Sequence, residues 1–530
     1  MPDVYLYDTT LRDGTQRRGI SLSLEDKIRI AELLDQYGVD YIEGGWPASN
    51  PKDTAFFHAM KGRLQHARLA AFGSTRRKDI PVQDDANLRA IVDLDVPTAT
   101  LFGKASRFQA EKILETTVEE NLRMVEESCR FLVDHGLEVV FDAEHYFDGF
   151  KADPEYALAV VRAAVNGGAA WVVLCDTNGG SLPDAIHEGV AAARQFVNVQ
   201  LGIHAHDDAG LAVANSLEAV RAGAVMVQGT INGYGERCGN ANLVTIWPNL
   251  VWKMGLEAGK PERLRDLTHL SRVVAEIANL APNESQPYVG ENAFTHKAGV
   301  HAGAVRKYPE AYEHVPPDSV GQTRHILVSE LAGRSNFLYH FDGLDLPPEH
   351  LTRLVERVKQ LEAQGYQFED AESSMRLMVE RSLERVPAYF HIDRFHASVT
   401  HDSSSICEAT VRVRVADRHY VEVGEGAGPV HALDEALRKA LRREYPVIDE
   451  LRLTDYKVRV LDGQDATAAA VRVWIRSDYR GEVIQTVGVS RNILVASWDA
   501  LLDAVNYLLW SQKVPNRHEN PLAETLAPSH

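Results

Sequence analysis

Two histidines separated by one residue, His204 and His206, are the clearest candidates for chemistry in this chain. Residues two apart in a β-strand point to the same face, so a strand here would direct both imidazoles toward one point. Asp13 near the N-terminus offers a carboxylate, and Asn240 offers an amide oxygen. Together these four side chains predict a divalent-metal site with mixed nitrogen and oxygen ligands.

Simpler interpretations exist for the individual residues. Asp13 precedes a glycine, and Asp-Gly is common in turns. Asn240 could instead be the N-cap of a helix that starts there. A single histidine is more often a core or surface residue than a ligand, but a pair on one strand with a carboxylate favours a metal. The ligand set suits Zn²⁺, Mn²⁺ or Co²⁺, and also Mg²⁺ if substrate oxygens fill the open positions.

Charged residues near these ligands indicate which reaction a metal would assist. An ion with open positions acts as a Lewis acid on a carbonyl, and a 2-oxo acid chelates well through its carboxylate and ketone oxygens. Arg12 could place a cation beside the developing oxyanion, or it could form a structural salt bridge with Asp8 or Glu43. Glu144 and Glu236 are candidate bases or carboxylates that orient the reacting groups.

Eight short strands that alternate with amphipathic helices position these residues. The expected strands cover residues 4–8, 41–45, 68–73, 98–102, 138–143, 171–176, 199–206 and 224–229, and helices such as 24–36, 117–134, 154–166 and 211–222 lie between them. This pattern predicts an α/β fold, a (β/α)₈ TIM barrel with its active site at the C-terminal ends of the strands. The alternative is a doubly wound open sheet, but no glycine-rich dinucleotide fingerprint follows the first strand.

Three further parts follow the barrel, which we expect to span residues 1–275. Over residues 276–386 the alternation stops, and amphipathic stretches at 347–363 and 371–383 predict helical connector subdomains. Residues 387–513 carry a strand-rich pattern that leads to a helix twice, which predicts a regulatory α+β domain with an internal pseudo-repeat. The last residues, 514–530, are polar and contain proline, so we expect a frayed tail.

Composition limits the classes of protein and of partner. A chain of 530 residues with a formal net charge of −19 is expected to hold two or three domains and to bind no nucleic acid. We see no run of about 18 apolar residues, so we expect no membrane span. No signal peptide is visible, and the four cysteines are scattered, so a reducing, cytoplasmic setting is expected.

Three motifs resemble the signatures of the DRE-TIM metallolyases. They are DTTLRDGTQ at residues 8–16, HAHDD at 204–208 and GERCGN at 235–240. Within that superfamily the chain resembles the 2-isopropylmalate, homocitrate and citramalate synthases. The likeness extends to residues 296–301 and to residues 426–434, which are similar to a leucine-feedback domain. Residues 40–53 and 141–149 look like one class of (R)-citramalate synthase.

The resemblance implies a Claisen condensation of acetyl-CoA with a 2-oxo acid, followed by thioester hydrolysis to a hydroxy-diacid. Pyruvate is the expected acceptor, and 2-oxoisovalerate is the alternative acceptor. A different alternative is that the chain is a related lyase, which cleaves a carbon–carbon bond. The resemblance implies that Asp13, His204, His206 and Asn240 bind the metal and that Arg12 stabilises the oxyanion or enolate. It implies that Glu144 orients the reacting groups and that Thr177 binds the carboxylate of the 2-oxo acid. Proton transfer is implied for His301, with support from Tyr312. His301 lies outside the barrel, so it is expected to reach the site of a neighbouring subunit in a homodimer.

Two regions outside this set have expected ligands. Arg76 and Arg77, with Lys78, could contact the phosphates of CoA or could form a solvated loop. The C-terminal domain resembles a site for a branched-chain amino acid, and isoleucine is the logical inhibitor if the product is citramalate, which can feed 2-oxobutanoate. Alternatively, this domain only dimerises the protein. Its three closely spaced glycines would let backbone amides approach a small ligand (Gly424, Gly426 and Gly428).

Overall fold

The computed structural model describes residues 2–47, 49–297, 299–326, 348–399, 406–461 and 468–517. The chain divides into two compact units. The barrel unit comprises Met1–Phe294 and His314–Arg324, and the C-terminal unit comprises Thr295–Glu313 and His325–His530. The part of the expected tail from residue 518 to residue 530 lies outside the described residues.

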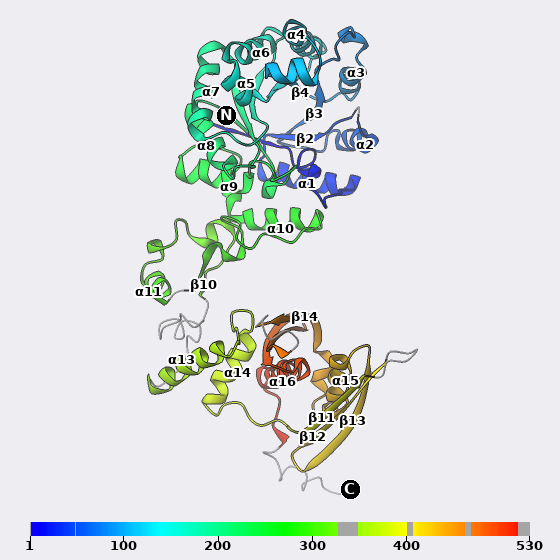
Figure 1. The fold of residues 1–530 in the computed structure, drawn as a ribbon, viewed down its shortest axis with the longest axis vertical. Helices are drawn as coiled ribbons and strands as arrows, with labels where there is room; N and C mark the ends of the chain where they lie inside the picture. Colours follow the sequence, from blue (N-terminus) through cyan, green and yellow to red (C-terminus); the bar gives the residue numbers. More distant parts are fainter. Residues whose placement is uncertain are drawn as a thin grey trace, which may run out of the picture. The chain divides into compact units, whose positions relative to one another are not determined.

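A closed barrel of eight parallel strands forms the first unit (Figure 1). The strands are β1 (Tyr5–Asp8), β2 (Tyr41–Gly45), β3 (Arg68–Ser74), β4 (Thr98–Lys104), β5 (Glu138–Glu144), β6 (Trp171–Asp176), β7 (Gln200–Ala205) and β8 (Met226–Gly229). Strand β1 pairs with both β2 and β8, which closes the sheet. The predicted barrel is therefore confirmed, and the open-sheet alternative is wrong.

Helices cover the outside of this barrel. They are α1 (Leu24–Tyr37), α2 (Pro51–Met60), α3 (Ala86–Val92), α4 (Val118–Asp134), α5 (Tyr146–Ala152), α6 (Pro154–Asn166), α7 (Pro183–Phe196) and α8 (Ala212–Ala222). Local sequence sets where they begin and end. Helix α1 starts with a capping box in which Ser23 and Asp26 bond each other's backbone amides. It ends at Gly38, whose φ of 82° is left-handed and therefore favours glycine.

Apolar and aromatic residues fill the interior of the barrel away from its C-terminal mouth. Tyr7 and Tyr41 stack with their ring centroids 5.6 Å apart, and Tyr41 meets Trp171 edge-on at 6.3 Å. Val140 and Met226 pack in the same buried cluster. Because this end is closed by packed side chains, polar groups and open space are concentrated at the other end of the strands.

Helices α9 (Leu243–Pro248) and α10 (Leu267–Ile277) continue the barrel unit. The connector elements of the C-terminal unit are β9 (Thr295–His296), α11 (Gly299–Lys307), β10 (His325–Ile326), α13 (Pro348–Ala363) and α14 (Glu372–Ser382). The bounds of helices α13 and α14 agree within one residue with the helices expected at residues 347–363 and 371–383. Ser374 and Arg381 on α14 both donate to the carboxylate of Asp503, at 2.8 and 2.9 Å. Helix α14 therefore packs as part of the C-terminal domain.

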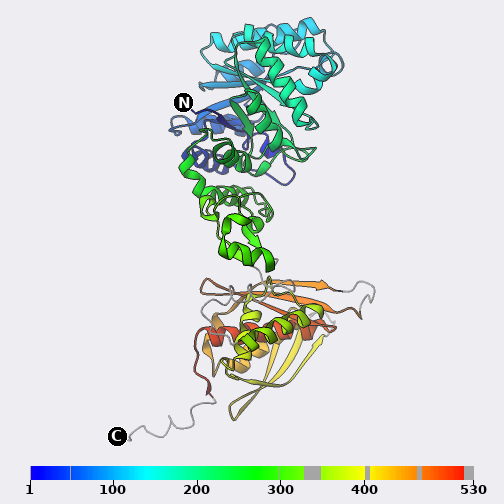
Figure 2. The same ribbon diagram turned by 90° about the vertical axis from the view of Figure 1, so that its left-hand side faces the viewer.

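The predicted internal repeat is confirmed by two three-stranded antiparallel sheets, each followed by a helix. Strands β11 (His391–Val399), β12 (Cys407–Val415) and β13 (Arg418–Gly426) precede α15 (Pro429–Leu441). Strands β14 (Arg452–Val460), β15 (Val471–Tyr479) and β16 (Glu482–Ser490) precede α16 (Ile493–Ser511). Each helix packs on its own sheet, and the two helices contact each other, so the helices lie between the sheets (Figure 2).

Close packing explains two of the three glycines that were expected to admit a ligand. A Cβ atom on Gly424 would lie 2.3 Å from the carbonyl oxygen of Ala432, and one on Gly426 would lie 2.6 Å from the Ala432 nitrogen. These glycines therefore let α15 approach β13, which is a different role from the one expected. Gly428 has no atom within 4 Å of such a Cβ, so it borders open space.

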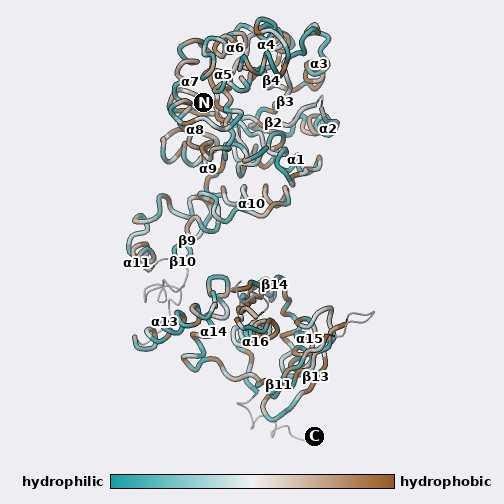
Figure 3. Tube along the Cα trace, viewed as in Figure 1, coloured by the Kyte–Doolittle hydropathy of each residue, from teal (hydrophilic) through white to brown (hydrophobic). Residues whose placement is uncertain are grey.

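Helix α16 is the one helix in the described part of the chain that is long and apolar enough to cross a membrane. It contains hydrophobic residues along its length (Figure 3). Ala500, Leu501, Leu508 and Leu509 are buried in the core of the C-terminal unit. Burial against β15 and β16 accounts for the apolar composition of this helix.

Candidate metal centre

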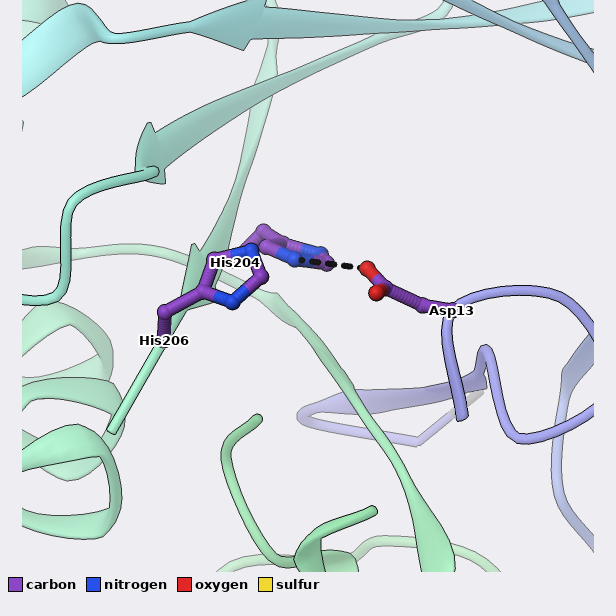
Figure 4. A group of neighbouring side chains, drawn as sticks. All are labelled: Asp13, His204 and His206. Carbon is purple, nitrogen blue, oxygen red and sulfur yellow. Dashed lines mark ion pairs between the residues drawn. The ribbon is translucent and has the colours of Figure 1, made fainter. Parts of the chain in front are cut away.

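Asp13, His204 and His206 converge at the mouth of the barrel (Figure 4). His204 lies near the end of β7, His206 directly follows that strand, and Asp13 lies in the loop after β1. Their candidate ligand atoms lie within 4.8 Å of one another, and Asp13 Oδ2 is 3.4 Å from His204 Nε2. The alternation of side chains on a strand therefore brings both imidazoles to one face, as the sequence suggested.

Asn240 joins this group through the backbone. It forms an isolated antiparallel bridge with His206, and its Nδ2 lies 3.3 Å from His204 Nε2. The alternative that Asn240 caps a helix is wrong, because Asn242 is the N-cap of α9 and accepts a hydrogen bond from Val244 N. Asn240 is therefore held in place by the sheet, and its side chain is left for another role.

Three buried polar atoms at this point have no hydrogen-bond partner among the described residues. They are Asp13 Oδ1, His206 Nδ1 and Asn240 Oδ1. Buried polar groups are nearly always satisfied, and leaving one unpaired costs about 1–3 kcal/mol. One carboxylate oxygen, one imidazole nitrogen and one amide oxygen are common ligands of a divalent cation. The residues present thus fit a metal ion at this position.

Electrostatics place Asp13 and His206 in the protonation states that metal ligands need. Burial opposes ionisation of Asp13, but Arg12 and His204 outweigh it and hold its pKa well below the usual range. Burial, together with the neighbouring His204, lowers the pKa of His206 to about 3. At neutral pH the site therefore offers an anionic carboxylate and a neutral imidazole.

Arg12 is fixed beside these ligands. Its Nε donates to Glu43 Oε1 at 2.5 Å, its Nη1 lies 3.4 Å from Asp13 Oδ2, and its Cζ is 3.8 Å from the ring centroid of Phe72. Glu43 is fully buried and also accepts a hydrogen bond from Tyr7 at 2.9 Å. Of the two possible partners considered for Arg12, Glu43 forms the ion pair.

Asp8 instead binds the loop that follows β1. Its two carboxylate oxygens accept hydrogen bonds from Thr10 N at 2.9 Å and from Thr10 Oγ1 at 2.7 Å. Burial raises the pKa of Asp8 to about 7, and the charge of Glu43 adds to that shift. Asp8 therefore shapes the backbone that carries Arg12 and Asp13.

A cavity of about 210 Å³ opens directly over these side chains. Most of the residues that the sequence assigned to the site line it: Arg12, Asp13, Glu144, Thr177, His204, His206 and Glu236. Trp46, Phe72 and Phe102 form an aromatic wall, in which Phe72 and Phe102 stack at 5.3 Å and Trp46 meets each edge-on at 5.6 Å. The cavity thus combines charged groups with a compact apolar wall.

Two of the predicted substrate-binding residues are held by neighbours that the sequence did not indicate. Glu144 forms an ion pair with Lys104 across strands β4 and β5. Thr177 Oγ1 accepts a hydrogen bond from the backbone amide of His145 at 2.8 Å, and Arg237 donates to the Thr177 carbonyl at 2.7 Å. Both side chains are therefore oriented before a substrate binds.

Arg76 is committed to protein contacts. It is buried, and its guanidinium binds Glu120 at 2.8 Å and Glu127 at 2.7 Å. Arg76, Arg77 and Lys78 all line a second cavity of about 530 Å³ that shares the aromatic wall residues Trp46 and Phe102 with the first. Lys78 Nζ donates to the Glu115 carbonyl at 2.8 Å.

His301 and Tyr312 belong to the C-terminal unit. Their rings lie together, with centroids 4.3 Å apart, and both side chains are exposed. Next to them in the chain, His296 Nε2 is 3.1 Å from Glu313 Oε1, and Glu313 is buried. The structure thus pairs the two residues that the resemblance linked in function.

Gln228 is a further residue of the site, and sequence reasoning missed it; its Oε1 lies 2.8 Å from His204 Nδ1. The signal in the sequence was a glutamine near the end of an otherwise apolar strand, Met226–Gly229. The structure shows that its side chain is fully buried. A buried amide of this kind requires a polar partner, and here that partner is a candidate metal ligand.

Three family models match successive parts of the chain. The HMGL-like family matches residues 3–274, the homocitrate synthase post-HMGL domain-like family matches 288–366, and the LeuA allosteric (dimerisation) domain matches 369–509. The chain is 49% identical to an (R)-citramalate synthase of Aquifex aeolicus, over 96% of this chain and 98% of that protein. An (R)-citramalate synthase of Geobacter sulfurreducens is 47% identical over 96% and 97%. A probable 2-isopropylmalate synthase of Methanopyrus kandleri is 33% identical over 96% and 99%.

Proposed function

The chain belongs to the family of (R)-citramalate synthases, which are condensing acyltransferases, and we propose that it makes (R)-citramalate and CoA from acetyl-CoA, pyruvate and water. A bond forms between the acetyl methyl carbon and the ketone carbon of pyruvate. One methyl proton is removed, the ketone oxygen gains a proton, and water cleaves the thioester to release CoA. The observation that carries the proposal is the convergence of Asp13, His204, His206 and Asn240 beside Arg12.

The three unpartnered ligand atoms support a divalent metal ion bound by Asp13, His204, His206 and Asn240. When bound, such an ion supplies Lewis-acid polarisation of a 2-oxo acid carbonyl. The donor set is compatible with Mn²⁺, Mg²⁺, Zn²⁺ or Co²⁺. The side chains around it then orient the two substrates.

Arg12 is the residue best placed to stabilise the oxygen that becomes negative as the new bond forms. Its Nε is used by Glu43, so the remaining N–H groups of its planar guanidinium can donate toward the cavity. Glu144, oriented by Lys104, positions the reacting groups, and the Thr177 hydroxyl donates to the carboxylate of the 2-oxo acid. These roles follow the family assignment residue by residue.

Proton transfer is assigned to His301, supported by Tyr312. Their rings are in contact and exposed, so they can act on a substrate outside their own unit. The match of the C-terminal domain to a dimerisation domain supports a homodimer. In that dimer, His301 of one subunit acts at the barrel of the other.

Pyruvate is favoured over 2-oxoisovalerate by the degree of sequence identity, and the aromatic wall offers an apolar surface to a small side chain. Trp46, Phe72 and Phe102 bound a cavity of only about 210 Å³. Identity to the named citramalate synthases reaches 49%, against 33% for the probable 2-isopropylmalate synthase. The acceptor that we propose is therefore pyruvate, whose methyl group would lie against this wall.

Feedback by isoleucine is the second part of the proposal. A cavity of about 730 Å³ in the C-terminal unit is lined by residues of α15, of β14 and of the segment between them. Val430, Leu451 and Leu453 are apolar. Asp434 and Arg442 carry opposite charges, and they pair with two other lining residues, Arg438 at 2.8 Å and Asp449 at 3.5 Å. Asp434 Oδ1 is buried without a hydrogen-bond partner among the described residues. An amino acid with an aliphatic side chain offers matching groups, an ammonium for Asp434 and a carboxylate for Arg442.

The choice of acceptor is tested by measuring free thiol released from acetyl-CoA with Mn²⁺ or Mg²⁺ present. Pyruvate, 2-oxobutanoate, 2-oxoisovalerate and 2-oxoglutarate are compared in parallel. The proposal expects the highest kcat/KM with pyruvate. A preference for 2-oxoisovalerate would reassign the enzyme to isopropylmalate synthesis. If none of the four acceptors supported thiol release, the condensation would be contradicted.

A further inference from the structure

Gln228 connects His204 to Asp142 across the interior of the barrel. Gln228 lies on β8 and is fully buried, opposite His204 in the register of β7 and β8. Gln228 Oε1 is 2.8 Å from His204 Nδ1, and Gln228 Nε2 donates to Asp142 Oδ1 at 2.9 Å. Asp142 lies on β5 and borders the cavity. A continuous chain of hydrogen bonds therefore runs from β5 through β8 to a candidate metal ligand on β7.

The chemistry of these groups fixes the direction of each bond. When it is ionised, the Asp142 carboxylate can only accept, so it faces the NH₂ group of Gln228, whose Nε2 lies 2.9 Å from Asp142 Oδ1. Burial raises the pKa of Asp142 to about 7, so this direction holds above that pH. The amide oxygen then faces His204, and because it too can only accept, Nδ1 must carry the ring proton. A neutral His204 ring with its proton on Nδ1 has its lone pair on Nε2.

That lone pair points toward the candidate metal position. His204 Nε2 is 3.4 Å from Asp13 Oδ2 and 3.3 Å from Asn240 Nδ2, which are both on ligand residues. If Gln228 were absent, the ring proton could move to Nε2, and that nitrogen would then be unable to bind a cation. Partners that fix the ligand tautomer in this way typically change metal affinity 10–100-fold when they are removed.

We propose that Gln228 is a positioning residue that, together with Asp142, holds His204 in the Nδ1–H tautomer and so keeps Nε2 available to a divalent metal ion. This inference rests on the metal site in the proposed function. A purely structural role for Gln228 would affect the stability of the barrel, but it would not change the metal affinity of protein that remains folded. Metal binding is thus the readout that separates the two roles.

The test uses the full chain, stripped of metal with a chelator, and isothermal titration with Mn²⁺ alone. The visible absorption of added Co²⁺ reports ligand geometry. Gln228→Leu removes the acceptor that faces His204 Nδ1. Gln286→Leu is the matched control, because Gln286 is buried in the same unit and donates to Asn232, away from the ligands.

We expect the Kd for Mn²⁺ to rise about 10–100-fold in Gln228→Leu, with an altered Co²⁺ spectrum. Gln286→Leu is expected to stay within about threefold of the parent. Parental affinity and an unchanged Co²⁺ spectrum in folded Gln228→Leu would overturn the inference. A parent protein that binds neither ion would instead overturn the proposed metal site, so the two failures are distinguishable.

Asp142→Asn provides a second test if Gln228→Leu does not fold. An amide at position 142 can donate as well as accept, so Gln228 loses the constraint that orients its oxygen toward His204. The expected result is a rise of more than about threefold in the Kd for Mn²⁺, with unchanged secondary structure by circular dichroism. An Asp142→Asn protein that binds Mn²⁺ like the parent would contradict the proposed chain of hydrogen bonds.

Discussion

Arg12 and Glu43 form an ion pair inside the barrel, with Arg12 Nε 2.5 Å from Glu43 Oε1 and the Glu43 side chain fully buried. The pair joins the loop after β1 to the end of β2, and the ring of Phe72 covers the guanidinium at 3.8 Å. Because the guanidinium is planar, fixing one edge also fixes the direction of its other N–H groups. Glu43 thus sets the direction of the donors that Arg12 presents to the cavity.

Replacing Glu43 with glutamine is expected to lower kcat about 10–100-fold, because Arg12 loses its charged partner and its donors are no longer aligned with the developing oxyanion. Steady-state thiol release measures the effect. Glu138→Gln is the control, since Glu138 pairs with Arg68 at the opposite end of the barrel strands. An unchanged kcat in Glu43→Gln would contradict the role given to this pair.

The pH dependence of stability is expected to carry a contribution from Asp8. Its folded-state pKa of about 7 lies above the value of about 3.9 for an unfolded chain. Folding therefore favours the protonated form, and this stabilisation, complete below about pH 4, is lost as the pH rises through 7. Asp8→Asn cannot ionise, so the melting temperature of the parent relative to this variant should fall between pH 4 and pH 8. Parallel curves over that range would show that Asp8 does not titrate in this way.

Phe102→Ala is expected to shift the choice of acceptor toward larger 2-oxo acids. The substitution removes one ring of the aromatic wall and enlarges the cavity beside Phe72. The ratio of kcat/KM for 2-oxoisovalerate to that for pyruvate should rise about tenfold or more, the usual effect of one or two methylene groups. Phe108→Ala, which removes an exposed ring on the loop after β4, should leave the ratio unchanged.

Asp434→Asn is expected to weaken the binding of isoleucine at least about tenfold, since a buried charge-assisted hydrogen bond is worth about 1.5–3 kcal/mol. Titration calorimetry with isoleucine measures the change directly. Asp417→Asn serves as a control in the same domain, because Asp417 lies in the turn between β12 and β13 and does not line the cavity. Equal isoleucine affinity in the parent and in Asp434→Asn would place the effector elsewhere.

The barrel could be predicted from sequence because its signal is local and repeated. Each buried parallel strand is a short apolar run, and each strand ends in polar residues that only the mouth of a barrel can bring together. His204 and His206 were identifiable because side chains two apart on a strand share a face. The same regularity allowed the pseudo-repeat of the C-terminal domain to be recognised.

Contacts between distant strands could not be predicted in the same way. The pairing of Glu43 rather than Asp8 with Arg12 depends on side-chain directions that only the closed barrel defines. The ion pairs of Arg76 with Glu120 and Glu127 likewise join residues that are far apart in the chain. The role proposed for His301 involves a second subunit, and local sequence patterns carry no signal for such a contact.

The most direct test of the central claim is the formation of citramalate by metal-free and metal-restored protein. Protein stripped with EDTA is given acetyl-CoA and pyruvate, before and after addition of Mn²⁺, and free thiol and citramalate are measured in the same reaction. Asp13→Ala is treated identically. We expect the two products to appear in equal amounts only after Mn²⁺ is restored. Asp13→Ala is expected to lose at least about 10²-fold in rate, comparable to the loss of a key electrostatic group. Equal citramalate formation with and without metal, or by Asp13→Ala and the parent, would contradict the central claim.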